Sequence, residues 1–282
     1  NWRNNIYYYT LGAQMNIKKS LLFCLAIAIS GQASAHSRWL LPSHFTLSSE
    51  QGEWIAVDAS ASNEVFNVDK ALSIDGMSIL TPSGKKARPS SSYKAHRKSV
   101  ADYFIEDSGT YKITNNASAS YFSSYKVADK RQRARVNKAE LKAMAPANAT
   151  NLQTTYGLTR VETYITMNNP TENYGTDGQF LELLPKTHPA EIVENEPATF
   201  TFTYHGKAQA GVEVEIAPDG ARYRNTPNVM KLITDKNGEI TFTPAQAGRY
   251  LLIAEYQQEA KNKALADKEQ GGVFLTFEAQ LQ

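Results

Sequence analysis

The sequence predicts a mainly β protein that consists of two β-sandwich modules joined by a short helical connection. Apolar and polar residues alternate over short spans that end at Gly, Pro, Asn or Asp, which is the period of half-buried strands. The 247 residues expected in the mature chain, 36–282, have room for one large domain or two ordinary ones. A weak internal repeat, in which a strand, a glycine turn and a tyrosine follow one another, supports the division into two modules.

Residues 1–35 are expected to be removed from the mature protein. Residues 1–14 precede the first methionine and resemble translated upstream sequence, whereas residues 15–35 resemble a signal peptide. The signal peptide has a basic pair, a short apolar run and a small-residue cleavage site, namely Lys18 and Lys19, residues 21–29, and Ala33-Ser34-Ala35. Cleavage after Ala35 would place the protein in the periplasm. No later apolar run is long enough to cross a bilayer, so no membrane span is expected in the mature chain.

The first module is expected over residues 36–127 and the second over residues 186–282. The repeat places Tyr111 in the first module and Tyr250 in the second just after a glycine turn, at the start of a strand. A tyrosine at such a corner of an immunoglobulin-like sandwich can hydrogen-bond back to the turn. We therefore predict an immunoglobulin-like, Greek-key arrangement for both modules.

The residues between the modules, 128–185, are expected to form a helical and irregular connection with one bridging strand. A short helix is predicted near residues 138–145, with its charged side chains on a solvated face. The alternating residues 160–166 predict the strand that leads toward the second module.

The charge pattern argues against a nucleic-acid partner. The formal charge of +2 falls to about −1 without the leader, because three of the 30 Lys and Arg residues lie within it. Two basic runs remain, at residues 85–88 and 130–135. Nucleic-acid binding needs a clustered basic face, whereas short charge runs usually face solvent. No nucleic-acid binding is expected.

His36 carries the most specific chemical prediction. After cleavage, its α-amine and imidazole would form a two-nitrogen chelate for a transition metal, because both groups can lose a proton near neutral pH. The only cysteine, Cys24, lies in the leader, so a metal site must use nitrogen and oxygen ligands. His188 is the preferred second ligand, because Pro189 holds it extended at the module junction. The sequence has no hydrolase or nucleotide-binding motif, and the protein is expected not to be an enzyme.

Seven segments of the mature chain have a recognisable pattern. They are His36-Ser37-Arg38-Trp39-Leu40-Leu41-Pro42-Ser43, residues 57–66, Gly109-Thr110-Tyr111-Lys112, Arg160-Val161-Glu162-Thr163-Tyr164, residues 181–189, Arg222-Tyr223-Arg224 and residues 234–250. Together they resemble a family of exported bacterial proteins, domain of unknown function 4198. The resemblance implies a link to periplasmic components of nickel and cobalt uptake and to outer-membrane metal receptors. The family's alanine–histidine start falls on Ala35 and His36, and its Thr-His-Pro element includes His188.

Three functions are compatible with these observations. The first is a periplasmic accessory protein that binds a divalent transition metal (nickel, cobalt, copper or zinc) and supports its uptake with an outer-membrane receptor or a transporter component. The second is a metal-free interaction module that docks an envelope receptor, with Trp39, Leu40 and Leu41 serving only as core. The third is a copper oxidase with an N-terminal histidine brace, which requires a second histidine beside His36.

Overall fold

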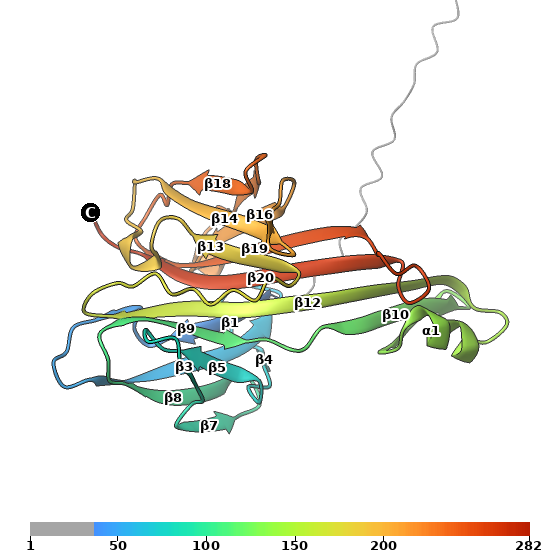
Figure 1. Cartoon of the computed structure of the whole chain (residues 1–282), viewed down its shortest axis with the longest axis horizontal. Coiled ribbons are helices and arrows are strands. Elements are labelled where there is room, and N and C mark those ends of the chain that lie inside the picture. Colours follow the sequence, from blue (N-terminus) through green and yellow to red (C-terminus); the bar gives the residue numbers. More distant parts are fainter. Residues whose placement is uncertain (1–36) are drawn as a thin grey trace, which may run out of the picture. The chain divides into compact units, whose positions relative to one another are not determined.

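The computed structural model describes residues 37–282, and strands predominate among them (Figure 1). The predicted mainly β fold is confirmed. The signal peptide and His36 lie outside the described residues. Within the described part of the chain, no helix is long and apolar enough to span a membrane.

The first module is a sandwich of two sheets. One sheet has the strand order β1-β3-β8-β7, with β4 paired to β3, and comprises β1 (Ser37–Pro42), β3 (Glu53–Ser62), β4 (Lys70–Ala71), β7 (Ser91–Lys94) and β8 (Ser99–Ile105). The facing strands have the order β12-β9-β5-β6 and comprise β5 (Met77–Leu80), β6 (Lys86–Ala87), β9 (Gly109–Asn115) and β12 (Thr150–Met167). The short β2 (Thr46–Leu47) pairs in parallel with the end of β12.

The second module repeats this plan. Its smaller sheet comprises β13 (Leu181–Pro185), β14 (Ala198–Tyr204), β15 (Lys207–Ala208) and β18 (Glu239–Phe242), with β14 paired to the other three. The facing strands have the order β17-β16-β19-β20 and comprise β16 (Glu213–Pro218), β17 (Met230–Ile233), β19 (Gly248–Glu259) and β20 (Lys268–Ala279). Two 3₁₀ turns interrupt the strands, η1 (Pro189–Glu191) and η2 (Ala221–Tyr223).

The two modules share the strand arrangement of immunoglobulin sandwiches. With the strands lettered in chain order, the sheets are A-B-E-D and G-F-C-C′ in the first module and A-B-E and G-F-C-C′ in the second. The predicted tyrosine corners are present at the starts of the two F strands, β9 and β19. The Tyr111 hydroxyl donates to the Asp107 carbonyl (3.0 Å), and the Tyr250 hydroxyl donates to the Gln246 carbonyl (2.6 Å). The internal repeat in the sequence therefore reflects a repeated topology.

A parallel pairing of β12 with β20 joins the modules. The two G strands pair from Thr155↔Lys268 to Thr163↔Thr276, so the two G-F-C-C′ sheets become one continuous sheet. Side chains on β12 alternate between two hydrophobic cores: Ile165 belongs to the core of the first module and Tyr164 to that of the second. The smaller sheets consequently cover opposite faces of the shared sheet (Figure 1), and the described residues belong to one compact unit.

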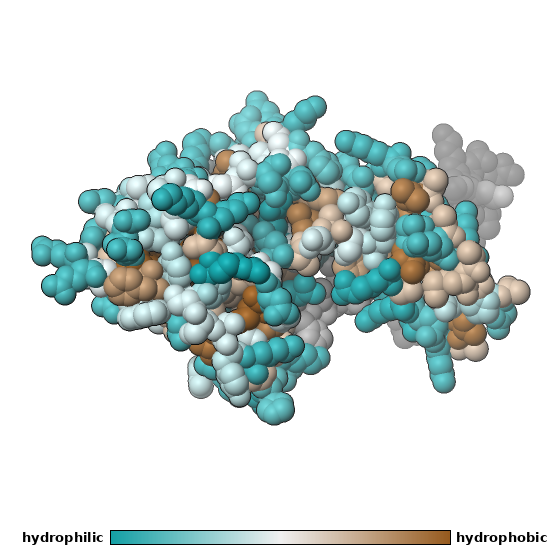
Figure 2. Space-filling model, turned by 60° about the horizontal axis from the view of Figure 1, so that its bottom comes forward, coloured by the Kyte–Doolittle hydropathy of each residue, from teal (hydrophilic) through white to brown (hydrophobic). Residues whose placement is uncertain are grey.

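An arm is inserted between the last two strands of the first module. It contains β10 (Ser120–Val127), β11 (Lys130–Ala134) and the predicted helix, α1 (Lys138–Met144). Asn137 and Glu140 form a reciprocal capping box that explains where α1 begins. The arm lies at one end of the shared sheet, where hydrophobic residues also reach the surface (Figures 1 and 2).

The region assigned to the connection, residues 128–185, holds more strand than the sequence suggested. The bridging strand predicted at residues 160–166 is the second half of the longer β12. In the structure, β12 completes the first sandwich and β13 begins the second. The module boundaries at residues 127 and 186 stay predictions from the sequence.

Candidate functional site

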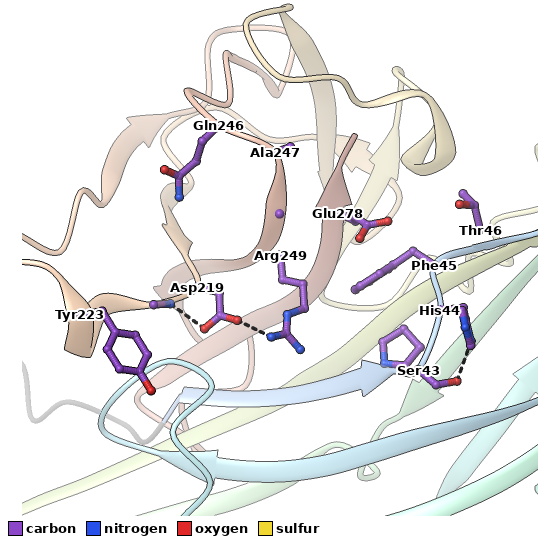
Figure 3. A pocket seen from close by; sticks show the side chains of 13 residues that line it. Ser43, His44, Phe45, Thr46, Asp219, Tyr223, Gln246, Ala247, Arg249 and Glu278 are labelled. Atoms are coloured by element: carbon purple, nitrogen blue, oxygen red, sulfur yellow. Dashed lines mark hydrogen bonds and ion pairs between the residues drawn. The ribbon is translucent and has the colours of Figure 1, made fainter. Parts of the chain in front are cut away.

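A groove of about 650 Å³ lies where the segment after β1 meets one end of the second module (Figure 3). We call it the seam groove. It is lined by Pro42, Ser43, His44, Phe45, Thr46, Asp219, Gly220, Tyr223, Gln246, Ala247, Gly248, Arg249 and Glu278. These residues come from both modules, and junctions of this kind are common places for ligand sites.

The first-module side of the groove is a bend that follows Pro42. The Ser43 amide donates to the Ala56 carbonyl (2.8 Å), and the Ala56 amide donates to the Ser43 hydroxyl (3.2 Å). Three residues after Ser43 the chain has turned toward β12, since Thr46 pairs with Thr166. His44 lies at the bend with its side chain exposed and its Nδ1 3.2 Å from the Ser43 hydroxyl.

The second-module side is built from the end of β16 and the start of β19. The Asp219 amide donates to the Arg249 carbonyl (2.8 Å), which fixes the two strands to each other. Gly220 then adopts a left-handed conformation (φ 85°), a backbone geometry that glycine tolerates, and the chain enters η2. Tyr223, at the end of η2, is 84% exposed beside the groove.

Three charged side chains form a row from the residue that follows β16 across β19 and β20. Arg249 contacts Asp219 through an ion pair of 2.7 Å, and it lies directly opposite Glu278 in the register of β19 and β20. Figure 3 shows the Arg249 guanidinium turned toward Asp219, with the Glu278 carboxylate on the other side of Arg249. Since the single arginine is engaged by Asp219, the row carries one negative charge that its own members do not neutralise.

Glu278 is the carboxylate that this arrangement leaves without a partner. Burial raises the pKa of Glu278, while the positive charges of Arg249 and His44 act in the opposite direction. A raised carboxyl pKa means that the surroundings do not fully replace the lost hydration of the anion. Glu278 can therefore gain from a ligand that brings a positive charge into the groove.

The structure places His188 in a buried hydrogen-bond network rather than on the surface. Its Nδ1 accepts from the Ala190 amide (3.0 Å), which leaves the proton on Nε2. Nε2 donates to the Thr171 carbonyl (3.1 Å) and lies 3.0 Å from the Thr110 hydroxyl. His188 thus caps η1 and fixes the segment after β12 to β9.

The predicted metal site of His36 and His188 stays a prediction, because His36 lies outside the described residues. The first described residue, Ser37, pairs with Ser62 at the end of β1 opposite Pro42. His188 contacts Thr110 of β9, and Thr110 pairs with Thr166 near the end of β12. The short β2, which follows the Pro42 end of β1 along the chain, pairs at the same place through Thr46. Among residues 37–282, no group of three or more His, Cys, Asp or Glu side chains is arranged to hold a metal ion.

Sequence reasoning did not find the charged row of the seam groove. Asp219 directly follows β16, Arg249 is on β19 and Glu278 is on β20, so the three become neighbours only through sheet register, which no local motif reveals. Three segments that carry the family resemblance contribute to the groove: the stretch from His36 to Ser43, Arg222-Tyr223-Arg224 and residues 234–250. Their proximity in space is the signal that could have indicated this site.

Comparison with known proteins identifies the family suggested by these segments. The family profile described as domain of unknown function (DUF4198) matches residues 33–258. No match was found among curated proteins. Among solved structures, the chain is similar to the adhesin InvE of Yersinia pseudotuberculosis, with 13% identity, a TM-score of 0.23, and coverage of 87% of this chain and 61% of that chain. The D0-D1 domain of intimin shows 13% identity, a TM-score of 0.22, and coverage of 86% and 97% respectively. The chain thus spans less than two thirds of the InvE chain.

Proposed function

The chain belongs to the DUF4198 family, and we propose that it is a non-catalytic binding protein of the cell envelope whose ligand lies in the seam groove. The observation that carries the proposal is the charged row, in which Glu278 is partly buried and forms no ion pair of its own with any of residues 37–282. The groove has the volume of a small-molecule or peptide side-chain site. The signal-like leader supports a location outside the cytoplasm.

The ligand class follows from the groups that line the groove. Glu278 favours a cationic group such as an ammonium or guanidinium. Gln246 and Ser43 offer hydrogen-bond donors and acceptors, and the exposed ring of Tyr223 offers an aromatic face for the same cation. A polar organic ligand with one positive charge satisfies these groups together.

Nuclear magnetic resonance titration with L-argininamide, a small guanidinium probe, tests this function. The probe should shift the backbone amide signals of Gly220 and Ala247, which line the groove, and Glu278→Gln should abolish those shifts. Glu196→Gln is the matched control, because Glu196 is exposed and lies outside the groove lining. Shifts that are equal in Glu278→Gln and in the unmodified protein would refute the proposal.

A transition-metal site at His36 is the second candidate function, and it rests on the cleavage site directly before that histidine. Nickel, cobalt, copper or zinc would be cargo for an uptake partner. Calorimetric titration with nickel and copper should give tight binding for the chain that begins at His36 and weak binding when one residue precedes it, because the α-amine is then lost as a ligand. Equal affinity of the two chains would eliminate the chelate. His188→Ala tests the second ligand, with an unfolding measurement alongside because His188 is also structural.

A further inference from the structure

The arm of the first module is one of two strongly positive stretches of the described chain, and the other is residues 85–101, which contain six Lys or Arg residues and no Asp or Glu. Residues 120–145 contain seven Lys or Arg residues and two Asp or Glu residues, whereas the remaining described residues contain 20 and 26. A chain that is close to neutral overall therefore has its positive charge gathered on two stretches, and the arm is the one that forms an insertion of its own. Such segregation favours attraction of a negatively charged partner.

Most of this charge lies on one exposed sheet face. Residues directly opposite each other in an antiparallel pair share a face, and the β10–β11 register pairs Lys126 with Arg131 and Ser124 with Arg133. Arg135 continues the row, with its guanidinium 5.0 Å from the centre of the Phe122 ring. We call this surface, with Phe122, Lys126, Arg131, Arg133 and Arg135, the basic face.

The opposite face of the arm is occupied by the protein itself. Ser123 and Thr154 are buried there, and the Ser123 hydroxyl donates to the Val136 carbonyl (2.8 Å) just before α1. Lys138, in the first turn of α1, pairs with Asp267 of the loop before β20. The fold thus covers one side of β10 and leaves the basic side open.

The cations of the basic face are unneutralised in the described part of the chain. None of its four Lys and Arg side chains forms an ion pair there, whereas Lys98 and Lys231 each pair with a carboxylate. Arg131 donates only to the neutral Ser124 hydroxyl (3.2 Å). Phe122 is 47% exposed among these cations.

We propose that the basic face is a docking surface for an anionic phospholipid membrane. Guanidinium groups pair with phosphate oxygens in a forked geometry, and an aromatic ring among them suits the boundary between headgroups and acyl chains. A flat row of like charges matches a planar array of phosphates. A folded acidic protein would instead need complementary charges and pockets placed individually.

Co-sedimentation with vesicles tests the proposal, using the chain without residues 1–35 so that the apolar leader does not contribute. The probes are vesicles of phosphatidylglycerol mixed with phosphatidylcholine, and vesicles of phosphatidylcholine alone. The protein should bind only the anionic vesicles, and raised ionic strength should release it. The triple variant Arg131→Gln, Arg133→Gln, Arg135→Gln should lower the partition coefficient roughly 100-fold, and Phe122→Ala should lower it several-fold.

The matched control is Lys85→Gln, Lys86→Gln, Lys94→Gln, which removes the same charge from exposed lysines on and beside β6 and on β7, far along the chain from the arm. Its partition coefficient should fall much less than that of the arm variant. Equal losses in the two triple variants would overturn the proposal, because net charge alone would then explain binding. The proposal would also fall if poly-glutamate bound the arm under conditions in which anionic vesicles did not, since the partner would then be an acidic polypeptide.

Discussion

The two modules have the same strand arrangement, but their strands in the shared sheet differ in the side chains that they turn away from their own sandwich. In the second module, Leu251 and Phe274 point away from their own sandwich and pack into the hydrophobic core of the first. In the first module, the corresponding face of β9 and β12 carries Lys112 and Glu162, which are buried with their charged groups 3.1 Å apart. The same topology is thus joined by apolar packing on one face, and on the other by apolar packing of Leu158 and Tyr164 together with a buried ion pair.

This difference determines which substitutions each face tolerates. A buried apolar contact loses only its packing when one side chain is shortened. A buried ion pair leaves an uncompensated charge when one member is removed. Neither carboxylate oxygen of Glu162 has a hydrogen bond within the described residues, so Lys112 is its principal compensation.

Loss of Lys112 should therefore have the largest effect. Lys112→Met should lower the free energy of unfolding by about 3–5 kcal/mol, and Lys112→Met with Glu162→Leu should recover most of that loss. Urea unfolding followed by circular dichroism measures both values. Lys231→Met is the matched control: its partner Glu215 and Lys231 itself are exposed, so the unfolding midpoint should hardly change. A double variant as unstable as the single one would show that packing, and not the unpaired charge, dominates.

A second comparison concerns the two tyrosine corners. The Tyr111 hydroxyl both donates to the Asp107 carbonyl and accepts from the Asp107 amide, whereas the Tyr250 hydroxyl donates only to Gln246. Tyr111→Phe should therefore cost about 1–2 kcal/mol of unfolding free energy, and Tyr250→Phe about half as much. Urea unfolding of the two variants measures both losses and shows which is larger. A larger loss in Tyr250→Phe would contradict the assignment of stability to these hydrogen bonds.

The smallest expected effect is a gain in stability when Glu255 on β19 is replaced by a neutral residue. Burial raises the pKa of Glu255, and Glu213 and Glu215 on the neighbouring β16 raise it further. The folded state then binds protons more readily than the unfolded state, so this carboxyl group destabilises the fold above its raised pKa and ceases to do so as pH falls through it. Glu255→Gln should raise the unfolding midpoint at neutral pH and leave it unchanged in acid. A loss at neutral pH would contradict this prediction.

The sequence predicted those parts of the fold that depend on local patterns. The strand alternation, the corners at Tyr111 and Tyr250, and a helix near residues 138–145 were all visible because each involves neighbours along the chain. The parallel pairing of β12 with β20 was not, since it joins strands more than 100 residues apart and has no turn signal.

The candidate site was less predictable than the fold for the same reason. Glu278 and Arg249 meet through the register of β19 and β20, and His44 reaches them only because the chain bends after Pro42. For His188, the backbone was predictable from the sequence but the side-chain contacts were not. The proline neighbour of His188 indicated an extended residue at the module junction. In the structure, both ring nitrogens of His188 lie within hydrogen-bond distance of groups of the protein itself.

The account depends most on the claim that Glu278 binds a cationic group in the seam groove, and a calorimetric titration with L-argininamide at several pH values tests it most directly. Affinity should be constant well above the raised pKa of Glu278 and should fall as pH drops through it, because protonation removes the negative charge. The fall should persist in His44→Gln, which separates the carboxyl group from the neighbouring imidazole, and Glu278→Gln should bind weakly at every pH. Binding by the unmodified protein that is as strong in acid as at neutral pH would contradict the account.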